Sequence, residues 1–204
     1  MSAGPFTHIE EWFPRAHDDA RYLRLWRGAA LTYSPGQPID ATWHQDDYPS
    51  VIGHDATPQL FERASHLLMR YRFYPADVMR HISDFGLEQR PLRAGDRIVQ
   101  RIHILRWLDL PLLDVITMNE VTAVVDEERR QGFTYTTTQC HAEVGEWTAL
   151  VEWRESGDVT LTLRAVSRPG PRLPFFAHSF ARQLQLRAHH RALASFRQWA
   201  LNVP

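Results

Sequence analysis

Hydrophobic and polar positions alternate with a period of two through most of the chain after residue 64. Met69, Tyr71 and Phe73 alternate with two arginines, which predicts a strand with one apolar and one charged face. Five further segments are predicted to be strands, at residues 97–106, 114–126, 132–141, 146–154 and 159–168. Tight turns such as the Ser-Gly-Asp sequence at 156–158 separate the later segments, so we expect antiparallel pairing.

The end of the chain changes to a helical period, which predicts an amphipathic helix from about residue 175 to 201. Its apolar stripe consists of Phe180, Leu184, Ala188, Ala192 and Phe196. Shorter helices are predicted near residues 15–27 and from Pro75 to Phe85. Because runs of strands followed by a helix are typical of α+β proteins, we predict an α+β fold. In it, a curved antiparallel sheet of about six or seven strands grips the long C-terminal helix.

The first 60 residues lack both periods, apart from the short helix. Pro, Gly, His and Asp are frequent there, and we predict an irregular N-terminal extension, residues 1–60, packed on a main domain of residues 61–204. Aromatic side chains would hold the extension in place, because a mobile tail would leave them in water. These residues are Trp12, Phe13, Trp26 and Trp43.

The composition of the chain narrows the classes of function. The 204 residues suit one domain with an extension, and the net charge of -1 argues against a broad nucleic-acid-binding surface. All 23 residues counted as lysine or arginine are arginines, which excludes a lysine Schiff base. Cys140 is the only cysteine, so an intrachain disulfide and a cysteine-based zinc site are excluded and a reducing compartment is expected.

Segments that direct a chain to membranes or bind common cofactors are also missing from the sequence. No apolar run approaches the ~20 residues of a membrane helix, and no basic start followed by an apolar run opens the chain. We therefore expect a cytoplasmic protein without a membrane span. Neither a glycine-rich phosphate loop nor a nucleophile motif is present, so no cofactor is predicted. The 11 histidines show no metal-ligand spacing, so no metal is predicted.

The order of the predicted elements resembles the helix-grip fold of START-like and Bet v 1-like proteins. This resemblance implies a cavity, lined by apolar side chains, between the curved sheet and the terminal helix. A sharper resemblance lies in five groups of residues between 126 and 187. They are Asp126-Glu127-Glu128, Gly132-Phe133-Thr134-Tyr135, His141-Ala142-Glu143-Val144-Gly145-Glu146, Ala165-Val166-Ser167-Arg168-Pro169, and Arg182 with Gln185.

In combination these groups resemble the uncharacterised protein family 0548, the domain of unknown function DUF1990. The family pattern runs roughly G-F-x-Y-G-T-L-P-x-H-x-E-x-G-E, then a strand ending in S-R-P, then R-x-x-Q on the last helix. This chain departs from the pattern at Thr136, Thr138 and Gln139, which leaves open the shape of the turn after this strand. The resemblance implies the fold and carries no settled activity.

The first candidate site follows from strand alternation. Tyr135, Thr137 and His141 fall on one side of the strand predicted at 132–141, and Glu143 and Glu146 follow in the turn. A histidine beside a carboxylate can act as a general base, so His141 with either glutamate is a candidate acid–base pair. The alternative, which we favour, is a turn held together by hydrogen bonds of these side chains, because such pairs are often structural.

The second candidate site is a polar junction between the last strand and the terminal helix, formed by Ser167, Arg168, Arg182 and Gln185. Arg168 is a candidate clamp for a carboxylate or a phosphate. We favour the alternative that these residues tie the strand to the helix, since arginine commonly fixes such junctions. Arg101 and His103, by contrast, alternate with apolar neighbours and are predicted to face solvent.

Three functions are compatible with these patterns. The first is binding of a small apolar or amphipathic molecule between the sheet and the C-terminal helix, where polar side chains would orient it. The predicted ligand-binding residues are Tyr71, Ile102, Tyr135, Thr137, His141, Leu161, Leu163, Phe180 and Leu184. A solid, close-packed core is the alternative for the same residues. The second function is a cyclase- or hydrolase-like enzyme that uses the His–Glu pair, by analogy of fold. The third is a non-catalytic protein-interaction domain with a filled core.

Overall fold

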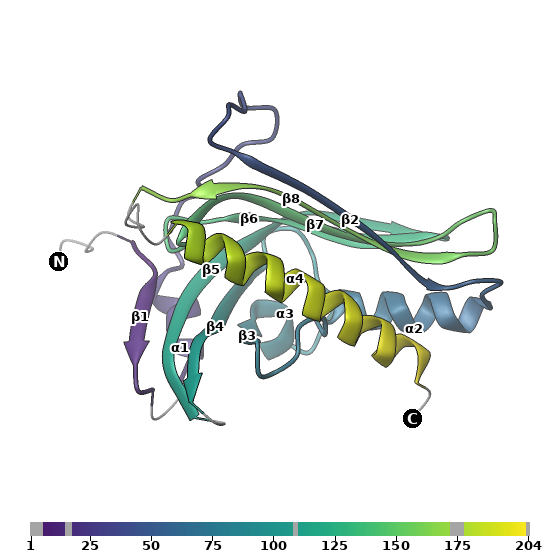
Figure 1. The fold of residues 1–204 in the computed structure, drawn as a ribbon, viewed down its shortest axis with the longest axis horizontal. Helices are drawn as coiled ribbons and strands as arrows, with labels where there is room; N and C mark the ends of the chain where they lie inside the picture. The colour runs from purple at the N-terminus through teal and green to yellow at the C-terminus, as the bar shows by residue number, and fades with distance from the viewer. Residues whose placement is uncertain (1–5, 15–17, 108–109, 172–177, 203–204) are drawn as a thin grey trace.

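One antiparallel sheet and a long helix lying across it make up most of the structure (Figure 1). The computed structural model describes residues 6–14, 18–107, 110–171 and 178–202. Seven strands form the sheet in the order β2-β8-β7-β6-β5-β4-β3, and the eighth, β1, pairs with β5. Neighbouring strands are all antiparallel.

The strands, in chain order, are β1 (Ile9–Trp12), β2 (His44–Gly53), β3 (Met79–Ser83), β4 (Arg97–Trp107), β5 (Leu110–Glu127), β6 (Arg130–Thr137), β7 (Glu143–Trp153) and β8 (Val159–Pro169). The helices are α1 (Ala20–Leu25), α2 (Pro58–Met69), α3 (Asp84–Leu87) and α4 (His178–Leu201).

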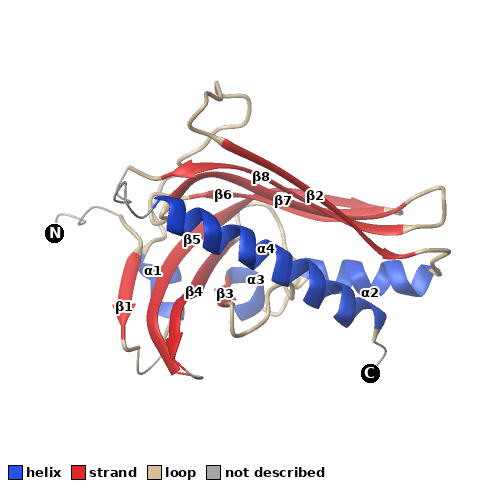
Figure 2. Ribbon diagram, in the orientation of Figure 1, coloured by secondary structure: helices blue, strands red, loops and turns tan. Residues whose placement is uncertain are grey.

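The five strands predicted from 97 to 168 and the terminal helix are present within a few residues of their predicted bounds, and the α+β helix-grip fold is confirmed. Helix α4 crosses the sheet diagonally (Figure 2). The predicted start of this helix, near residue 175, lies outside the described residues. Within the described part of the chain, no helix is both long and apolar enough to cross a membrane.

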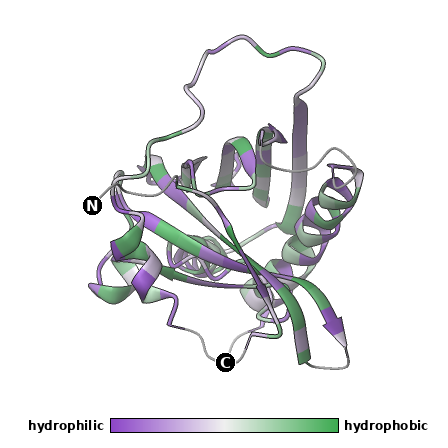
Figure 3. Cartoon of the chain, turned by 90° about the vertical axis from the view of Figure 1, so that its left-hand side faces the viewer, coloured by the Kyte–Doolittle hydropathy of each residue, from purple (hydrophilic) through white to green (hydrophobic). Residues whose placement is uncertain are grey.

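The main core fills the space between the sheet, α2 and the second half of α4. Phe73, Phe133, Leu163 and Phe196 are among its fully buried side chains. Along the strands, hydrophobic and hydrophilic residues follow one another in short intervals, as Figure 3 shows, because successive side chains point to opposite faces.

The strand predicted around Met69, Tyr71 and Phe73 is wrong. Residues 58–69 form helix α2, which Pro58 begins and whose buried face includes Leu60, Ala64 and Leu68. Residues 70–73 form a turn in which Tyr71 has a left-handed backbone (φ 56°). The helical period before residue 69 therefore determines the structure, and the apparent alternation only spans the end of the helix and this turn.

The helix predicted from Pro75 to Phe85 is also largely wrong. Residues 79–83 form the edge strand β3, and only the short helix α3 follows. Ser83 begins α3, because its Oγ accepts a hydrogen bond from the backbone N–H of Gly86 at 3.1 Å. Gly86 lies inside this short helix.

The N-terminal 60 residues are more regular than predicted. They contain β1, the short helix α1 and the ten-residue edge strand β2, which pairs with β8. Pro49 is compatible with this strand because β2 lies at the edge of the sheet. Trp26 and Trp43 are buried as expected, whereas Trp12 and Phe13 are exposed and do not anchor the segment.

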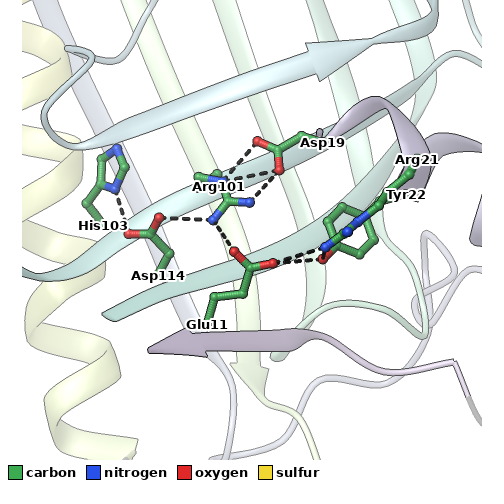
Figure 4. Close-up of polar contacts among 7 residues, drawn as sticks. All are labelled: Glu11, Asp19, Arg21, Tyr22, Arg101, His103 and Asp114. Atoms are coloured by element: carbon green, nitrogen blue, oxygen red, sulfur yellow. Dashed lines mark hydrogen bonds and ion pairs between the residues drawn. The ribbon is translucent and has the colours of Figure 1, made fainter. Parts of the chain in front are cut away.

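Arg101 is buried beneath this N-terminal segment, and the prediction that Arg101 and His103 face solvent is wrong (Figure 4). The guanidinium donates to Glu11 at 2.8 Å, to Asp19 at 2.5 Å and to Asp114 at 3.0 Å. His103 Nδ1 lies 2.7 Å from the other oxygen of Asp114. Alternation placed these side chains on the convex face of the sheet. There they are covered by α1 and by the side chain of Glu11 from β1, which pairs with β5.

Candidate functional site

A cavity of about 300 Å³ lies between the concave face of the sheet and the first half of α4. Its apolar wall includes Ile102, Ile104, Leu113, Val115, Phe180 and Leu184. Small side chains at Ala165 of β8 and at Ala181 and Ala188 of α4 leave this space unfilled. Phe180 is 50% exposed, which places it at the edge of the cavity.

Polar side chains gather at the place where β2, β7, β8 and the first turns of α4 meet. Arg182 donates to both carboxylate oxygens of Asp46, at 2.6 Å and 2.5 Å, and to Gln185 Oε1 at 2.7 Å. Gln185 Nε2 lies 3.3 Å from Glu143 Oε2 and 3.2 Å from Ser167 Oγ, and donates to both. This chain of hydrogen bonds connects the Arg182–Asp46 ion pair to the carboxyl group of Glu143.

Glu143 has the most unusual environment of these residues. It is partly buried, it lines the cavity, and among the described residues its carboxyl group accepts only the 3.3 Å hydrogen bond from Gln185. Burial raises the pKa of Glu143 to about 7, while the charge of Arg182 lowers it and that of Asp46 raises it. Near neutral pH this carboxyl group is therefore present in both protonation states.

Aromatic and amide side chains line another part of the cavity. The rings of Tyr135 and Trp147 stack with centroids 5.0 Å apart, and burial raises the pKa of Tyr135 to about 12. Gln100 Nε2 donates to the hydroxyl of Tyr71 at 2.5 Å, and Gln100 Oε1 accepts from Thr117 at 3.3 Å. These groups hold one another in place and stay uncharged at neutral pH.

The His–Glu pair predicted as an acid–base unit has a different geometry. Strand β6 ends at Thr137, so the alternation expected to continue to His141 is interrupted by a turn. His141 Nδ1 accepts a hydrogen bond from the backbone N–H of Glu143 at 2.9 Å, and burial lowers its pKa to about 4. Within the described residues, no carboxylate forms a hydrogen bond or ion pair with the His141 ring. A hydrogen bond from the Glu143 backbone to the His141 ring, and not a bond between the two side chains, therefore holds this turn.

Glu146 lies on the other face of β7. Strand alternation separates its side chain from those of Glu143 and Trp147, which face the cavity. On the convex face, burial raises the pKa of Tyr33, and the charge of Glu146 raises it further. Glu146 is still one of the residues that border the cavity. The Glu146 carboxyl group therefore cannot serve as the partner of His141 in this fold.

The nine predicted ligand-binding residues divide into two groups. Six line the cavity, namely Ile102, Tyr135, Thr137, His141, Phe180 and Leu184. Tyr71, Leu161 and Leu163 lie in the packed core and are at most 2% exposed. The Thr137 hydroxyl already bonds the backbone of Gly145 and the hydroxyl of Thr32, so it has little capacity left for a ligand.

The predicted polar junction is present for three of its four residues. Ser167, Arg182 and Gln185 meet beside the cavity, where Gln185 accepts a hydrogen bond from Arg182 and donates one to Ser167. Arg168 lies on the opposite face of β8, and its guanidinium stacks over the ring of Trp43 at 4.9 Å. Arg168 therefore does not clamp a ligand in this cavity.

Several lining or supporting residues were not predicted from the sequence. Gln100 shares a face with Ile98 and Ile102, so alternation could have identified it. His189 follows Gln185 by four residues, which places both on one face of α4. Asp46 had no comparable signal, because its segment was interpreted as irregular. Among the described residues, no group of three His, Cys, Asp or Glu side chains is arranged to hold a metal ion.

Comparison with known proteins identifies a family and several proteins of similar structure. The family model described as Domain of unknown function (DUF1990) matches residues 28–195. A hypothetical protein from Helicobacter pylori, jhp0584, is similar in structure with a TM-score of 0.53 and 9% identity, over 84% of this chain and 96% of that one. A search of curated proteins found no match.

Two further solved structures are similar at lower scores. The di-domain ARO/CYC protein StfQ of the steffimycin biosynthetic pathway has a TM-score of 0.49 and 12% identity, over 78% of this chain and 51% of that one. The major latex-like protein 151 of Panax ginseng has a TM-score of 0.44 and 13% identity, over 76% and 99% of the two chains.

Proposed function

This chain belongs to the DUF1990 family, and from the geometry of its cavity we propose that it binds a small, largely apolar molecule between the sheet and α4. The observation that carries this proposal is the cavity of about 300 Å³ itself. Its volume lies at the lower end of the range for small-molecule sites, and such sites combine apolar walls with a few polar groups, as this one does.

The distribution of side-chain size along α4 supports the proposal. In the second half of the helix, Phe196 fills the space above the sheet and is fully buried. In the first half, Ala181 and Ala188 occupy positions that border the cavity. Because protein interiors are otherwise packed as densely as organic crystals, an unfilled apolar space of this size requires an occupant or water.

A pair of variants on one helix tests the proposal. Ala188→Phe places a ring in the cavity, whereas Ala194→Phe makes the same change at an exposed position of α4. The probe is N-phenyl-1-naphthylamine, an uncharged aromatic molecule whose fluorescence rises when it leaves water. We expect saturable binding to the unmodified chain and to Ala194→Phe, and at least about tenfold weaker binding to Ala188→Phe.

Native mass spectrometry of gently purified protein supplies a second measurement. A small molecule that copurifies with the unmodified chain and with Ala194→Phe, but not with Ala188→Phe, is the expected result. Equal probe binding by all three proteins, or absence of both probe binding and a copurifying molecule, would contradict the proposed function.

A further inference from the structure

The cavity has an uneven balance of charge. Two glutamates have side chains on its face of the sheet, Glu143 on β7 and Glu10 on β1, which pairs with Val115 of the cavity wall. Among the residues that the structure describes, no arginine lines the cavity, and the chain contains no lysine. His141 and His189 also line it, and burial lowers the pKa of each to about 4, so both are uncharged at neutral pH.

Glu143 differs from the other buried acidic side chains in lacking an arginine partner. Asp46, Asp96 and Asp114 have side chains that are 8%, 3% and 0% exposed. Each of them forms an ion pair with an arginine, namely Arg182, Arg90 and Arg101 in that order. Among the described residues, Glu143 forms no ion pair, and a carboxylate withdrawn from water without a cation is costly.

The arginine whose charge acts on this carboxyl group, Arg182, is not available to a ligand. Arg182 is held by both oxygens of Asp46 and by Gln185, so its charge is compensated in place. Asp46 also acts on Glu143, and its negative charge raises the pKa of the carboxyl group. The charge of Glu143 acts on Tyr74 and Tyr135, whose hydroxyl pKa values burial raises above their usual range, so both stay uncharged. Within the described part of the chain, the cavity therefore presents a carboxyl group without a countercharge.

A second observation is that two polar groups of the cavity wall lack a hydrogen-bond partner within the described residues. His189 and Trp147 are each 4% exposed and line the cavity. His189 Nδ1 and Trp147 Nε1 have no hydrogen-bond partner within the described residues. Buried polar atoms are nearly always bonded, so these two are exceptions. The His189 nitrogen can accept a hydrogen bond from an N–H group of a bound molecule, whereas the Trp147 N–H is a donor and requires an acceptor such as water.

We propose that the molecule bound in this cavity is an amphipathic amine, with its ammonium group at Glu143 and its apolar body against Ile102, Val115 and Leu184. This inference rests on the proposed function and narrows it to a class of ligand. The ammonium group supplies the cation that Glu143 lacks, in the way that arginine does for the three buried aspartates. A neutral or anionic ligand of the same shape leaves the Glu143 carboxylate without a cation.

Three probes of nearly equal size test the inference. They are 2-phenylethylamine, 2-phenylethanol and phenylacetate, which are respectively cationic, neutral and anionic at pH 8. Isothermal titration calorimetry with the full chain is expected to rank them in that order, with the amine at least about tenfold tighter than the alcohol. In Glu143→Gln the amine loses this advantage, because the amide carries no charge, while the alcohol binds as before.

The matched control is Glu152→Gln, which makes the same change at the other end of β7, on the face turned away from the cavity. It is expected to keep the full preference for the amine. The amine should also bind about tenfold more weakly at pH 6 than at pH 8, because protonation with a pKa of about 7 removes the charge of Glu143. Glu143→Gln should abolish this pH dependence.

The outcomes separate the inference from the function on which it rests. Binding of 2-phenylethanol or phenylacetate as tight as that of the amine, or a preference for the amine that persists in Glu143→Gln, overturns the inference and leaves ligand binding in place. Failure of all three probes and of N-phenyl-1-naphthylamine to bind overturns both.

Discussion

The two faces of the sheet bury charge in opposite ways. On the convex face, the fully buried Arg101 donates hydrogen bonds to Glu11, Asp19 and Asp114, and these bonds attach β1 and α1 to the sheet. On the concave face, Glu143 borders a cavity and receives one long hydrogen bond from Gln185. Among the described residues, three carboxylates compensate the buried charge of Arg101, whereas the carboxyl group of Glu143 has no cationic partner.

The difference separates a structural role from a functional one. A buried ion pair adds little to the free energy of folding compared with apolar packing. Removal of one partner, however, leaves the other charge buried and unpaired, which is strongly destabilising. Such pairs therefore fix the arrangement of the segments that supply them. A carboxyl group without a cation costs stability in the free protein, and its retention beside an unfilled cavity favours a role in binding. Substitutions at Arg101, Glu143 and Asp46 test these two roles separately.

The largest effect is expected for Arg101→Ala. It leaves Glu11, Asp19 and Asp114 close together beneath the N-terminal segment, and we expect a loss of about 3–5 kcal/mol in the free energy of unfolding at neutral pH. Urea denaturation measures it. Arg130→Ala serves as the control, because Arg130 and Glu127 form an exposed pair at 3.2 Å that contributes less than about 1 kcal/mol. Equal losses in the two variants would show that the network on the convex face is not structural.

A smaller effect of opposite sign is expected for Glu143→Gln without ligand. The folded-state pKa of Glu143 is about 7, above its ordinary value of 4.5, so ionisation disfavours the folded state. This penalty is absent below pH 4.5, grows between pH 4.5 and 7, and is complete above pH 7. The variant should therefore be more stable than the unmodified chain by up to about 3 kcal/mol at pH 8, and equally stable at pH 4.

Urea denaturation of both proteins across this pH range checks that sign. Comparison of the two proteins at each pH cancels the contributions of the other titrating groups, including those of His141 and His189. A variant that is less stable than the unmodified chain at pH 8 would mean that Glu143 has a cationic partner in the free protein.

The smallest effect is expected for Asp46→Asn. The change leaves Arg182 without its carboxylate, so the charge of Arg182 acts on Glu143 without compensation. We expect a cost of about 1–2 kcal/mol in stability and a fall in the pKa of Glu143 below about 7. Carbon-13 NMR titration of the Glu143 carboxyl group measures the second effect, and an unchanged pKa would show that the Arg182–Asp46 pair does not influence the cavity.

Local sequence determined the elements of this fold with a repeating pattern. Strands β4 to β8 and helix α4 were predicted because periods of two and of 3.6 residues follow from backbone geometry and need no knowledge of distant contacts. Six of the nine predicted ligand-binding residues line the cavity for the same reason. Helix α2 was missed because an alternation across its last residue and the following turn imitated a strand.

Tertiary structure alone decided what each face of the sheet meets. Alternation placed Arg101 opposite the apolar face, but β1 and α1, from a distant part of the chain, bury it. The cavity and the isolation of Glu143 depend on how far α4 lies from β8 and on Asp46 of β2 holding Arg182. Sequence periodicity fixes the direction of a side chain, whereas burial and charge compensation depend on segments that the chain brings together only when it folds.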